Sequence, residues 1–285
     1  TLLFSATMPD RIAKLAKRYM NNPKKLEVDR AQPTTGLTDQ IYFEVREGDK
    51  FDALTRIIDI EPEFYGLVFC RTRNDVDTVT SKLIERGYGA EGLHGEITQA
   101  QREKTLAKFR KRYINVLVAT DVAARGIDIV DLTHVINYSL PQDPESYIHR
   151  IGRTGRAGKQ GTAITFVSNE EYRKLNYVQK ATKVNIRKEI LPNAQDIVAV
   201  KKEKIKDELF EIIKQGSYED YLGMAEDLIE TNSPEVTLAA LLRLAFKTQL
   251  DVSSYSEIRS FRVDTKGTTR LFIGLGRKDG MSPKK

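Results

Sequence analysis

The chain has 285 residues, of which 40% are hydrophobic and 30% charged, as is typical of a soluble globular protein. It contains no apolar run of about 18 residues, so we predict no membrane span, and its first residues do not have the pattern of a signal peptide. One cysteine and three histidines are too few to assemble a zinc site. The net charge of +6 favours a polyanionic partner without identifying one.

The first 29 residues predict a strand at 2–4, a helix at 9–20 and a strand at 25–28. Two short strands and one helix are too few to form a stable sheet. We therefore expect residues 1–29 to be the C-terminal end of a preceding domain. Residues 30–38 are polar and contain proline and glycine, which predicts an interdomain linker.

Residues 39–192 alternate short apolar runs with amphipathic stretches, which predicts one α/β domain with a parallel sheet covered by helices on both faces. Thr98 with Gln101 and Ser168 with Glu171 have the spacing of capping boxes. Cys70 lies in an apolar run and is expected to be a buried, unpaired thiol in a reducing compartment, hence the cytoplasm. The predicted strands are 41–45, 66–70, 89–93, 116–119, 134–137 and 162–167, and the predicted helices are 49–60, 74–86, 99–111, 143–151 and 169–180.

Functional loops of a parallel sheet lie beyond the carboxyl ends of its strands. Here those loops are expected at 71–73, 94–96, 120–121 and 139–156.

After residue 192 the pattern changes to helices, predicted at 196–215, 218–231 and 235–249. Gly216 is expected to end the first, and Ser217 and Ser233 to cap the next two. The last helix is apolar around most of its circumference, so another surface must cover it. Either the segment 193–252 docks on its own α/β domain or it forms a homodimer interface. Residues 253–285 predict a linker followed by a truncated β-containing tail, with a strand at 270–276.

Residues 149–156 contain three arginines and two glycines, shortly after a helix start at Asp143 and Pro144. On one turn of helix, Arg153 and Arg156 would project from the same face and repel each other unless an anion lay between them. Arginine binds phosphate bidentately and keeps its charge. This pattern favours a phosphate site over a basic run that only increases solubility.

Other stretches of the chain carry groups that could bind a nucleotide or a nucleic acid. Thr120 could contact a phosphate and Asp128 a ribose hydroxyl, within a stretch, 119–128, whose small residues allow a ligand to approach. Arg71, Arg73, Gln99 and Arg102 would add donors along the same edge of the sheet, and Ser5 and Thr7 supply two hydroxyls after the first predicted strand.

The order of these motifs resembles the DEAD-box ATP-dependent RNA helicases, of the bacterial cold-shock and ribosome-assembly type. The resemblance covers residues 1 to about 190. It implies the end of a first RecA-like domain and all of a second, with ATP in the cleft between them and RNA across both. Residues 193–252 resemble, more weakly, a dimerisation segment of some bacterial members, and the tail resembles the start of an RNA-recognition-motif-like domain.

The resemblance also implies roles for individual residues. Arg153 and Arg156 would act as arginine fingers on the γ-phosphate with His149 and Arg150 in support, and Gly126 and Asp128 would contact the nucleotide. RNA phosphates would be bound by the carboxyl-edge group, which is Arg71, Gly95, Gln99, Arg102 and Thr120. Ser5 and Thr7 would couple the ATP state to RNA binding.

The phosphate loop and the Asp-Glu-Ala-Asp stretch of this family do not occur in these 285 residues. Both are needed to hold ATP and Mg²⁺, so we expect the chain alone to be inactive as an ATPase. The main alternative is a non-catalytic RNA-binding and dimerisation scaffold. A Rossmann dinucleotide enzyme is disfavoured because no Gly-x-Gly-x-x-Gly motif follows the first strand of the α/β domain.

Overall fold

The apolar runs of the sequence form the parallel sheet at the centre of the molecule. The computed structural model describes residues 2–4, 8, 10–26, 37–124, 127, 129, 132–155, 158–247, 249–255 and 258. Every paired strand is parallel to its neighbours, in the order β3-β4-β2-β5-β6-β1-β7. The strands are β1 (Thr38–Glu44), β2 (Gly66–Cys70), β3 (Ala90–Leu93), β4 (Val116–Thr120), β5 (His134–Asn137), β6 (Gly161–Val167) and β7 (Arg187–Lys188).

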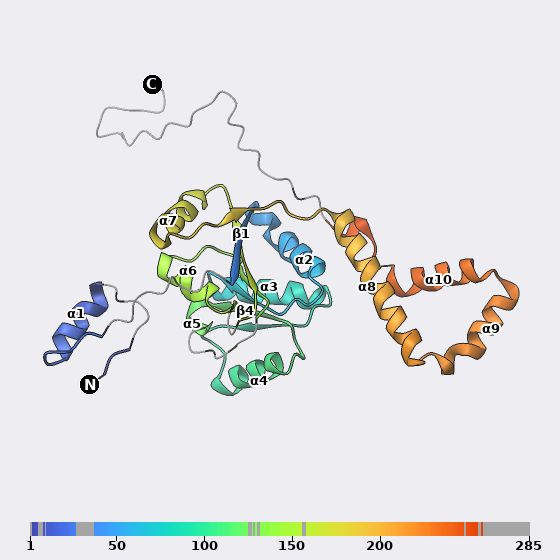
Figure 1. Cartoon of the computed structure of the whole chain (residues 1–285), viewed down its shortest axis with the longest axis horizontal. Helices are drawn as coiled ribbons and strands as arrows, with labels where there is room; N and C mark the ends of the chain where they lie inside the picture. The colour runs from blue at the N-terminus through green and yellow to red at the C-terminus, as the bar shows by residue number, and fades with distance from the viewer. Residues whose placement is uncertain are drawn as a thin grey trace, which may run out of the picture.

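Successive side chains of a strand point to opposite faces of the sheet, so each strand contributes to two apolar layers, one on each face. Val68 and Cys70 of β2 pack in the layer beneath α2 (Lys50–Ile60) and α3 (Arg73–Glu85). Leu67 and Phe69 point to the opposite layer, beneath α4 (Gln99–Arg110) and α5 (Asp121–Ala124). On that second face α6 (Pro144–Ile151) and α7 (Tyr172–Thr182) cover the strands toward β1 (Figure 1). The predicted α/β fold is confirmed.

The predicted elements agree with the structure except at some ends and in the shortest pieces. Cys70 is buried and unpaired, as predicted. Thr98 caps α4 by accepting from the Gln101 amide at 3.2 Å. The predicted box at Ser168 forms in one direction, because Glu171 accepts from the Ser168 amide while α7 itself begins at Tyr172. The four residues of α5 and the two of β7 were not predicted, since such short elements carry no periodic signal.

The two strands predicted in the first 29 residues do not form where the structure describes that segment. Residues 2–4 and 25–26 are irregular, whereas the predicted helix is present as α1 (Asp10–Tyr19). A strand is stable only beside a partner strand, and the described part of this segment pairs with none. Thr38, assigned to the linker, instead opens β1.

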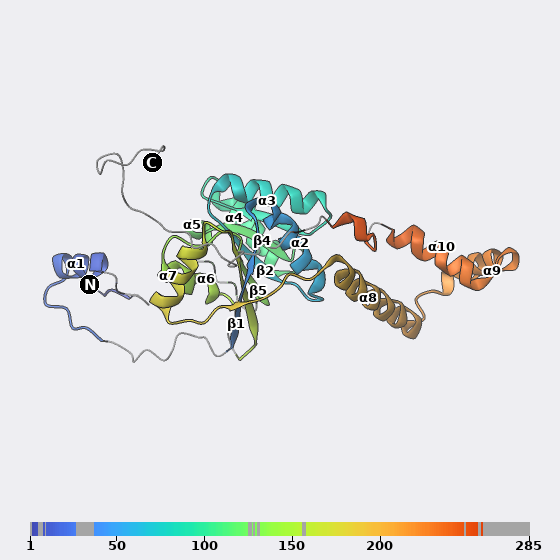
Figure 2. The same cartoon turned by 90° about the horizontal axis from the view of Figure 1, so that it is seen from above.

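The C-terminal helices form an arm that leaves the α/β domain (Figures 1 and 2). Its helices are α8 (Ala194–Gln215), α9 (Leu222–Thr231) and α10 (Pro234–Phe246), with short 3-10 turns η2 (Glu219–Tyr221) and η3 (Val252–Ser254). Three residues of α8 are buried, Ile197, Val198 and Ile205, whereas the described residues of α9 and α10 include none. Docking on the α/β domain therefore holds for α8 but not for α9 and α10.

Two of the three predicted helix signals in the arm are confirmed. Gly216 ends α8 in the left-handed conformation, and Ser233 caps α10. Ser217 does not cap α9, because a 3-10 turn separates it from the helix. The helix α10 also ends at Phe246, before the predicted residue 249.

The chain returns to the α/β domain after the arm. The Tyr255 hydroxyl donates to Asp59 Oδ2 at 2.6 Å, and Lys201 of α8 lies 2.9 Å from the same oxygen. Ile258 packs against the layer under α2. The polar stretch after residue 252 is thus anchored in its described part, and the predicted strand at 270–276 lies outside the described residues. No helix of the described residues has the length and apolarity to cross a membrane.

Candidate nucleic-acid and nucleotide site

Three adjacent strands end level with one another and bring part of the carboxyl-edge group together. Cys70 of β2 pairs with Thr120 of β4, and Leu93 of β3 pairs with Ala119. Because these ends are aligned, Arg71, Gly95 and Thr120 all lie at one edge of the sheet. The helix α4 begins at the same edge, which adds Gln99 and, one turn further on, Arg102.

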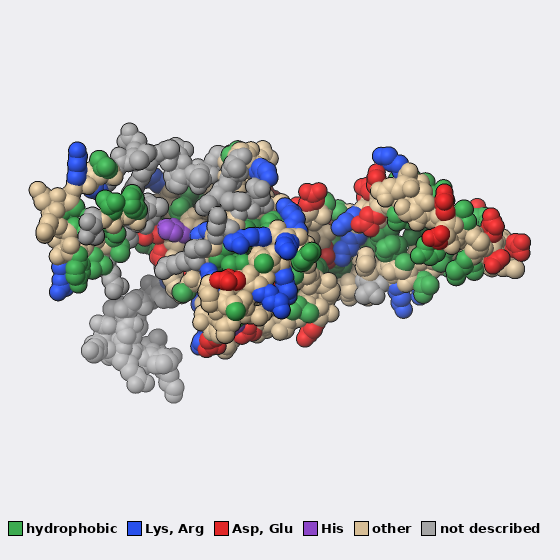
Figure 3. Space-filling view, turned by 90° about the horizontal axis from the view of Figure 1, so that it is seen from below, with side chains coloured by type: hydrophobic (Ala, Val, Ile, Leu, Met, Phe, Trp, Pro, Cys, Tyr) green, Lys and Arg blue, Asp and Glu red, His purple; other side chains and the backbone are tan. Residues whose placement is uncertain are grey.

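This edge is open and rich in polar side chains. A Cβ atom added to Gly95 would meet no atom within 4 Å, so packing does not require glycine there. An exposed ion pair joins Arg73 at the start of α3 to Glu96 in the loop before α4, and Gln99 donates to Glu103 within α4. Figure 3 shows Lys and Arg side chains gathered on the face that carries α4. The arrangement suits the backbone of an anionic polymer.

Thr120 is mostly buried, and its hydroxyl oxygen lies 3.4 Å from the Ala123 amide at the start of α5. A threonine in this position holds the β4–α5 turn. Its site role stays a prediction.

Arg150 is a predicted site residue whose guanidinium contacts several groups. Its guanidinium binds Asp121 bidentately, at 2.6 and 2.8 Å, and donates to Asn137 Oδ1 at 3.0 Å and to the Ser139 carbonyl at 2.7 Å. It also lies over the Phe69 ring, 4.8 Å from its centroid. A guanidinium so enclosed positions α6 against the end of β4 and has little surface left for a ligand, whereas His149 beside it is exposed.

The structure corrects the predicted placement of Arg153. The helix α6 ends at Ile151 and Gly152 is its C-cap, so Arg153 lies in the following turn and not on a helical face shared with Arg156. The side chain of Arg153 donates to the Ile127 carbonyl at 2.7 Å. It therefore holds the segment next to Gly126 and Asp128, the two residues predicted to contact the nucleotide.

The predicted loop 139–156 does not lie wholly at the carboxyl edge, contrary to expectation. Residues 139–143 do lie there, but α6 runs back across the sheet. Its end reaches the opposite edge, where Thr154 bridges to Leu132, just before β5 begins. An eight-residue helix is about 12 Å long, enough to cross the short strands. The arginine-rich turn and the carboxyl-edge group therefore lie at opposite ends of α6.

Gly155 allows this turn to pass close to the start of β1. Its φ of +67° is in the left-handed region, and a Cβ atom there would overlap the side chain of Thr38. The arginine-rich motif therefore requires glycine at position 155, because the turn passes so close to Thr38.

Comparisons with known proteins identify this arrangement. Residues 49–158 match the family model described as helicase conserved C-terminal domain. The C-terminal domain of the DEAD-box protein Dbp5 is 34% identical, with a TM-score of 0.53 over 58% of this chain and 98% of that one. This chain belongs to the DEAD-box family.

Two further DEAD-box relatives extend the likeness beyond that domain. The ATP-dependent RNA helicase CshA of Bacillus licheniformis is 44% identical over 87% of this chain and 51% of its own length. S. cerevisiae Dbp5 bound to RNA and ADP BeF3 is 33% identical, with a TM-score of 0.62 over 70% of this chain and 54% of that one. This DEAD-box chain thus spans about half the length of the curated relatives it matches.

Several residues that the DEAD-box motifs single out lie outside the described residues. These are Ser5, Thr7, Gly126, Asp128 and Arg156. The described residues contain no group of three or more His, Cys, Asp or Glu side chains that could hold a metal ion.

Sequence reasoning assigned no site role to Asp121, Asn137 or Glu171, although it placed Glu171 in a capping box. Asp121 was part of a recognised stretch, but nothing in the sequence indicated its partner 29 residues away, Arg150. Asn137 ends an apolar strand, and a polar residue at a predicted buried position is the signal that could have identified it.

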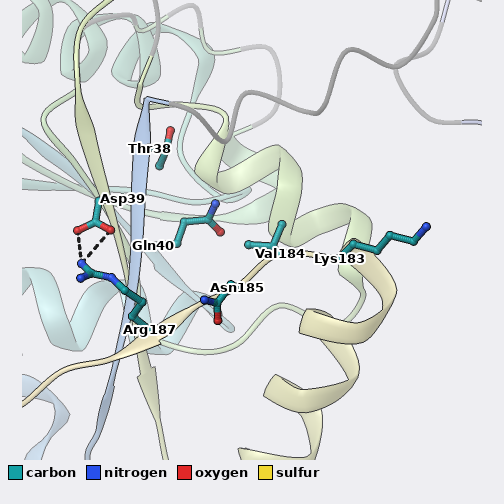
Figure 4. Close-up of a pocket in the computed structure, with 7 residues that line it drawn as sticks. All are labelled: Thr38, Asp39, Gln40, Lys183, Val184, Asn185 and Arg187. Atoms are coloured by element: carbon teal, nitrogen blue, oxygen red, sulfur yellow. Dashed lines mark hydrogen bonds and ion pairs between the residues drawn. The ribbon is translucent and has the colours of Figure 1, made fainter.

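A cavity of about 310 Å³ lies beside β1 and β7, at the opposite side of the sheet from β3 and β4 (Figure 4). Asp39 and Arg187 form an ion pair at its wall, 2.7 Å apart. None of the predicted site residues lines it. Its lining residues are Thr38, Asp39, Gln40, Lys183, Val184, Asn185 and Arg187.

Proposed function

We propose that this chain is the C-terminal part of an ATP-dependent RNA helicase that unwinds short duplexes. The observation that carries the proposal is the level ending of β2, β3 and β4, which places Arg71, Gly95 and Thr120 at one open edge beside the start of α4. The helicase names of relatives that match most of the chain support it.

RNA would lie along this edge with its phosphates on the carboxyl-edge group. Phosphate contacts carry no base sequence and release counterions, so binding is sequence-tolerant and weakens steeply with salt. The absence of a Cβ atom at Gly95 leaves room for the RNA backbone to approach.

ATP would bind at the other end of α6. Arg153 and Arg156 would contact the γ-phosphate, and Gly126 and Asp128 the rest of the nucleotide. The hydrogen bond from Arg153 to Ile127 supports this, since it joins the arginine-rich turn to the segment that holds both residues. Arg150 would support the site through its buried contacts, and His149 would do so from the exposed surface. Ser5 and Thr7 would couple the ATP state to RNA binding.

The Mg²⁺ ion would be bound by residues that are not in this chain, together with the phosphate loop. Without them the chain alone would bind RNA and not hydrolyse ATP. The buried thiol of Cys70 fits a reducing compartment, and we place the protein in the cytoplasm.

The test is RNA-stimulated ATP hydrolysis by the complete parent protein and its Arg153→Ala and Arg156→Ala variants. An arginine finger contributes on the order of 10³-fold in rate, so we expect turnover to collapse in both variants while RNA binding persists. Arg187→Ala is the control, because that arginine is an exposed ion-pair partner and belongs to neither group of predicted site residues. Unchanged turnover in the two variants would refute the finger assignment.

The scaffold alternative is favoured by one observation, the exposed apolar surface of the arm. Several large apolar side chains of α9 and α10 are open to solvent, and Figure 3 shows them along the arm. We propose that a second copy of this chain covers them, which is compatible with either function. A parent protein that binds RNA but never hydrolyses ATP would favour the scaffold.

A further inference from the structure

Glu171 is a nearly buried carboxylate that holds cations from two other elements. Its Oε2 atom lies 2.9 Å from Lys50 Nζ of α2, and its Oε1 atom accepts from Arg71 Nη2 at 3.2 Å. Each oxygen thus serves a different cation. The arginine is the residue of the carboxyl-edge group that follows β2.

The Lys50 side chain fixes the carboxylate in place. Lys50 is fully buried and also pairs with Glu47 at 2.8 Å, while the Ser168 amide donates to Glu171 Oε2 at 3.2 Å. Burial alone would raise the pKa of Glu171, but Lys50, the Ser168 amide and Arg71 outweigh it and lower the pKa below its usual value. Glu171 is therefore ionised at neutral pH and has two partners besides Arg71.

Arg71, in contrast, is half exposed, with 49% of its side chain open to solvent. A guanidinium has five N–H donors, and the described contact with Glu171 uses one edge of it. The remaining donors stay available at the open edge of the sheet. An arginine held in one orientation loses less conformational entropy when it binds a phosphate.

The local charge still favours an anion despite the carboxylate. Lys174 lies one turn along α7, and the hydrogen bonds described for its ammonium are both at 3.4 Å, to the Leu140 carbonyl and to Gln142 Oε1. Burial, and next to it the positive charge of Arg71, lower the pKa of Lys174. The carboxylates near Lys50, Arg71 and Lys174 are Glu171, the exposed Glu47 and Asp143, and Arg150 adds a further positive charge near Lys174.

We propose that Glu171 is a positioning residue for RNA binding, which holds the Arg71 guanidinium so that its free edge meets an RNA phosphate beside Lys174. This inference rests on the proposed RNA-binding function of the carboxyl edge. It adds the N-cap residue of α7, which the sequence indicated only as part of a capping box.

A double-mutant cycle tests the proposal, with the whole chain and a fluorescent single-stranded RNA at about 50 mM salt. Ordering one arginine costs enough to weaken binding about three- to tenfold, so we expect Glu171→Gln to lose that much affinity. In the Arg71→Ala background the same change should cause no further loss, because the residue it positions is gone. Equal losses in both backgrounds, or no loss, would overturn the proposal.

Two more variants separate positioning from folding and from charge. Glu44→Gln removes a carboxylate of matching exposure, 12% against 10%, that pairs with Lys188 instead, and should leave RNA affinity unchanged. Glu171→Asp keeps the charge for Lys50 but is one methylene shorter. It should weaken RNA binding only when Arg71 is present, and wild-type affinity for it would count against the proposal.

The single variant Arg71→Ala distinguishes a failure of the proposed RNA-binding edge from a failure of the positioning role of Glu171. If it binds RNA like the wild type, the assignment of the carboxyl edge fails. If it binds weakly but Glu171→Gln does not, only the positioning role fails.

Discussion

At the scale of residues, the ion pair of Arg150 with Asp121 and that of Arg187 with Asp39 are expected to contribute differently to stability. Arg150 is enclosed, and Asp121 supplies the only carboxylate among the contacts described for its guanidinium. Asp39 and Arg187 are both about half exposed, at 54% of their side chains. A buried cation that loses its partner is left uncompensated, whereas solvent replaces the partner of an exposed one.

We therefore expect Asp121→Ala to lower the free energy of unfolding by about 3 kcal/mol. Asp39→Ala, which breaks the exposed pair, should cost less than about 1 kcal/mol. Urea titrations of both variants, compared at equal m-values, measure the difference. Equal losses would mean that the Arg150 network is not the connection between α6 and β4 that the distances indicate.

At the scale of elements, the turn after α6 sets where the arginine-rich motif lies. The helix crosses the sheet, and the turn that follows is held by Arg153 on Ile127 and by the bridge between Thr154 and Leu132. Gly155 lets this turn pass against Thr38. The placement of the candidate nucleotide contacts thus depends on one close approach between backbone segments.

Gly155→Ala should destabilise the protein by about 3 kcal/mol, from left-handed backbone strain and overpacking together. Gly158→Ala is the matched control, since Gly158 has a φ of +80° but no atom within 4 Å of an added Cβ. It should lose only the strain contribution, about 1 kcal/mol. Thermal or urea unfolding that shows the same loss for both would contradict the close approach.

At the scale of the whole molecule, the arm carries apolar surface that the α/β domain does not cover. Its base is tied to Asp59 through Lys201 and Tyr255, while α9 and α10 extend away. Leu244 of α10 is 83% exposed. Burial of a leucine contributes about 1.5–3 kcal/mol, so the exposed arm is a costly surface for an isolated chain.

The proposed homodimer predicts that the chain sediments as a dimer at micromolar concentration. A two-fold interface would bury Leu244 twice, so Leu244→Ser should weaken the dimer by about 3 kcal/mol, or roughly 10²-fold. Ile190→Ser is the control, because Ile190 is equally exposed, at 87%, but lies outside the arm. A monomeric wild-type mass by analytical ultracentrifugation would exclude the interface.

Local patterns in the sequence predicted the class of fold and placed most helices and strands close to their observed bounds. The run from Gly66 to Cys70 is apolar on both faces because helices cover both sides of the sheet, and its bounds were predicted without error. Capping at Thr98 and Ser233 and the end of α8 at Gly216 were also predicted, since these signals depend on neighbours a few residues away. The motif order likewise indicated the DEAD-box family.

Which polar side chains contact one another depends on how distant parts of the chain are brought together in the fold. Asp121 and Arg150 lie 29 residues apart and Arg71 and Glu171 lie 100 apart, so no local pattern could pair them. The position of Arg153 depended on where α6 ends and on the length of the helix relative to the strands. Local propensities act over a few residues, whereas a site is assembled by the order of strands in the sheet, which the sequence does not state.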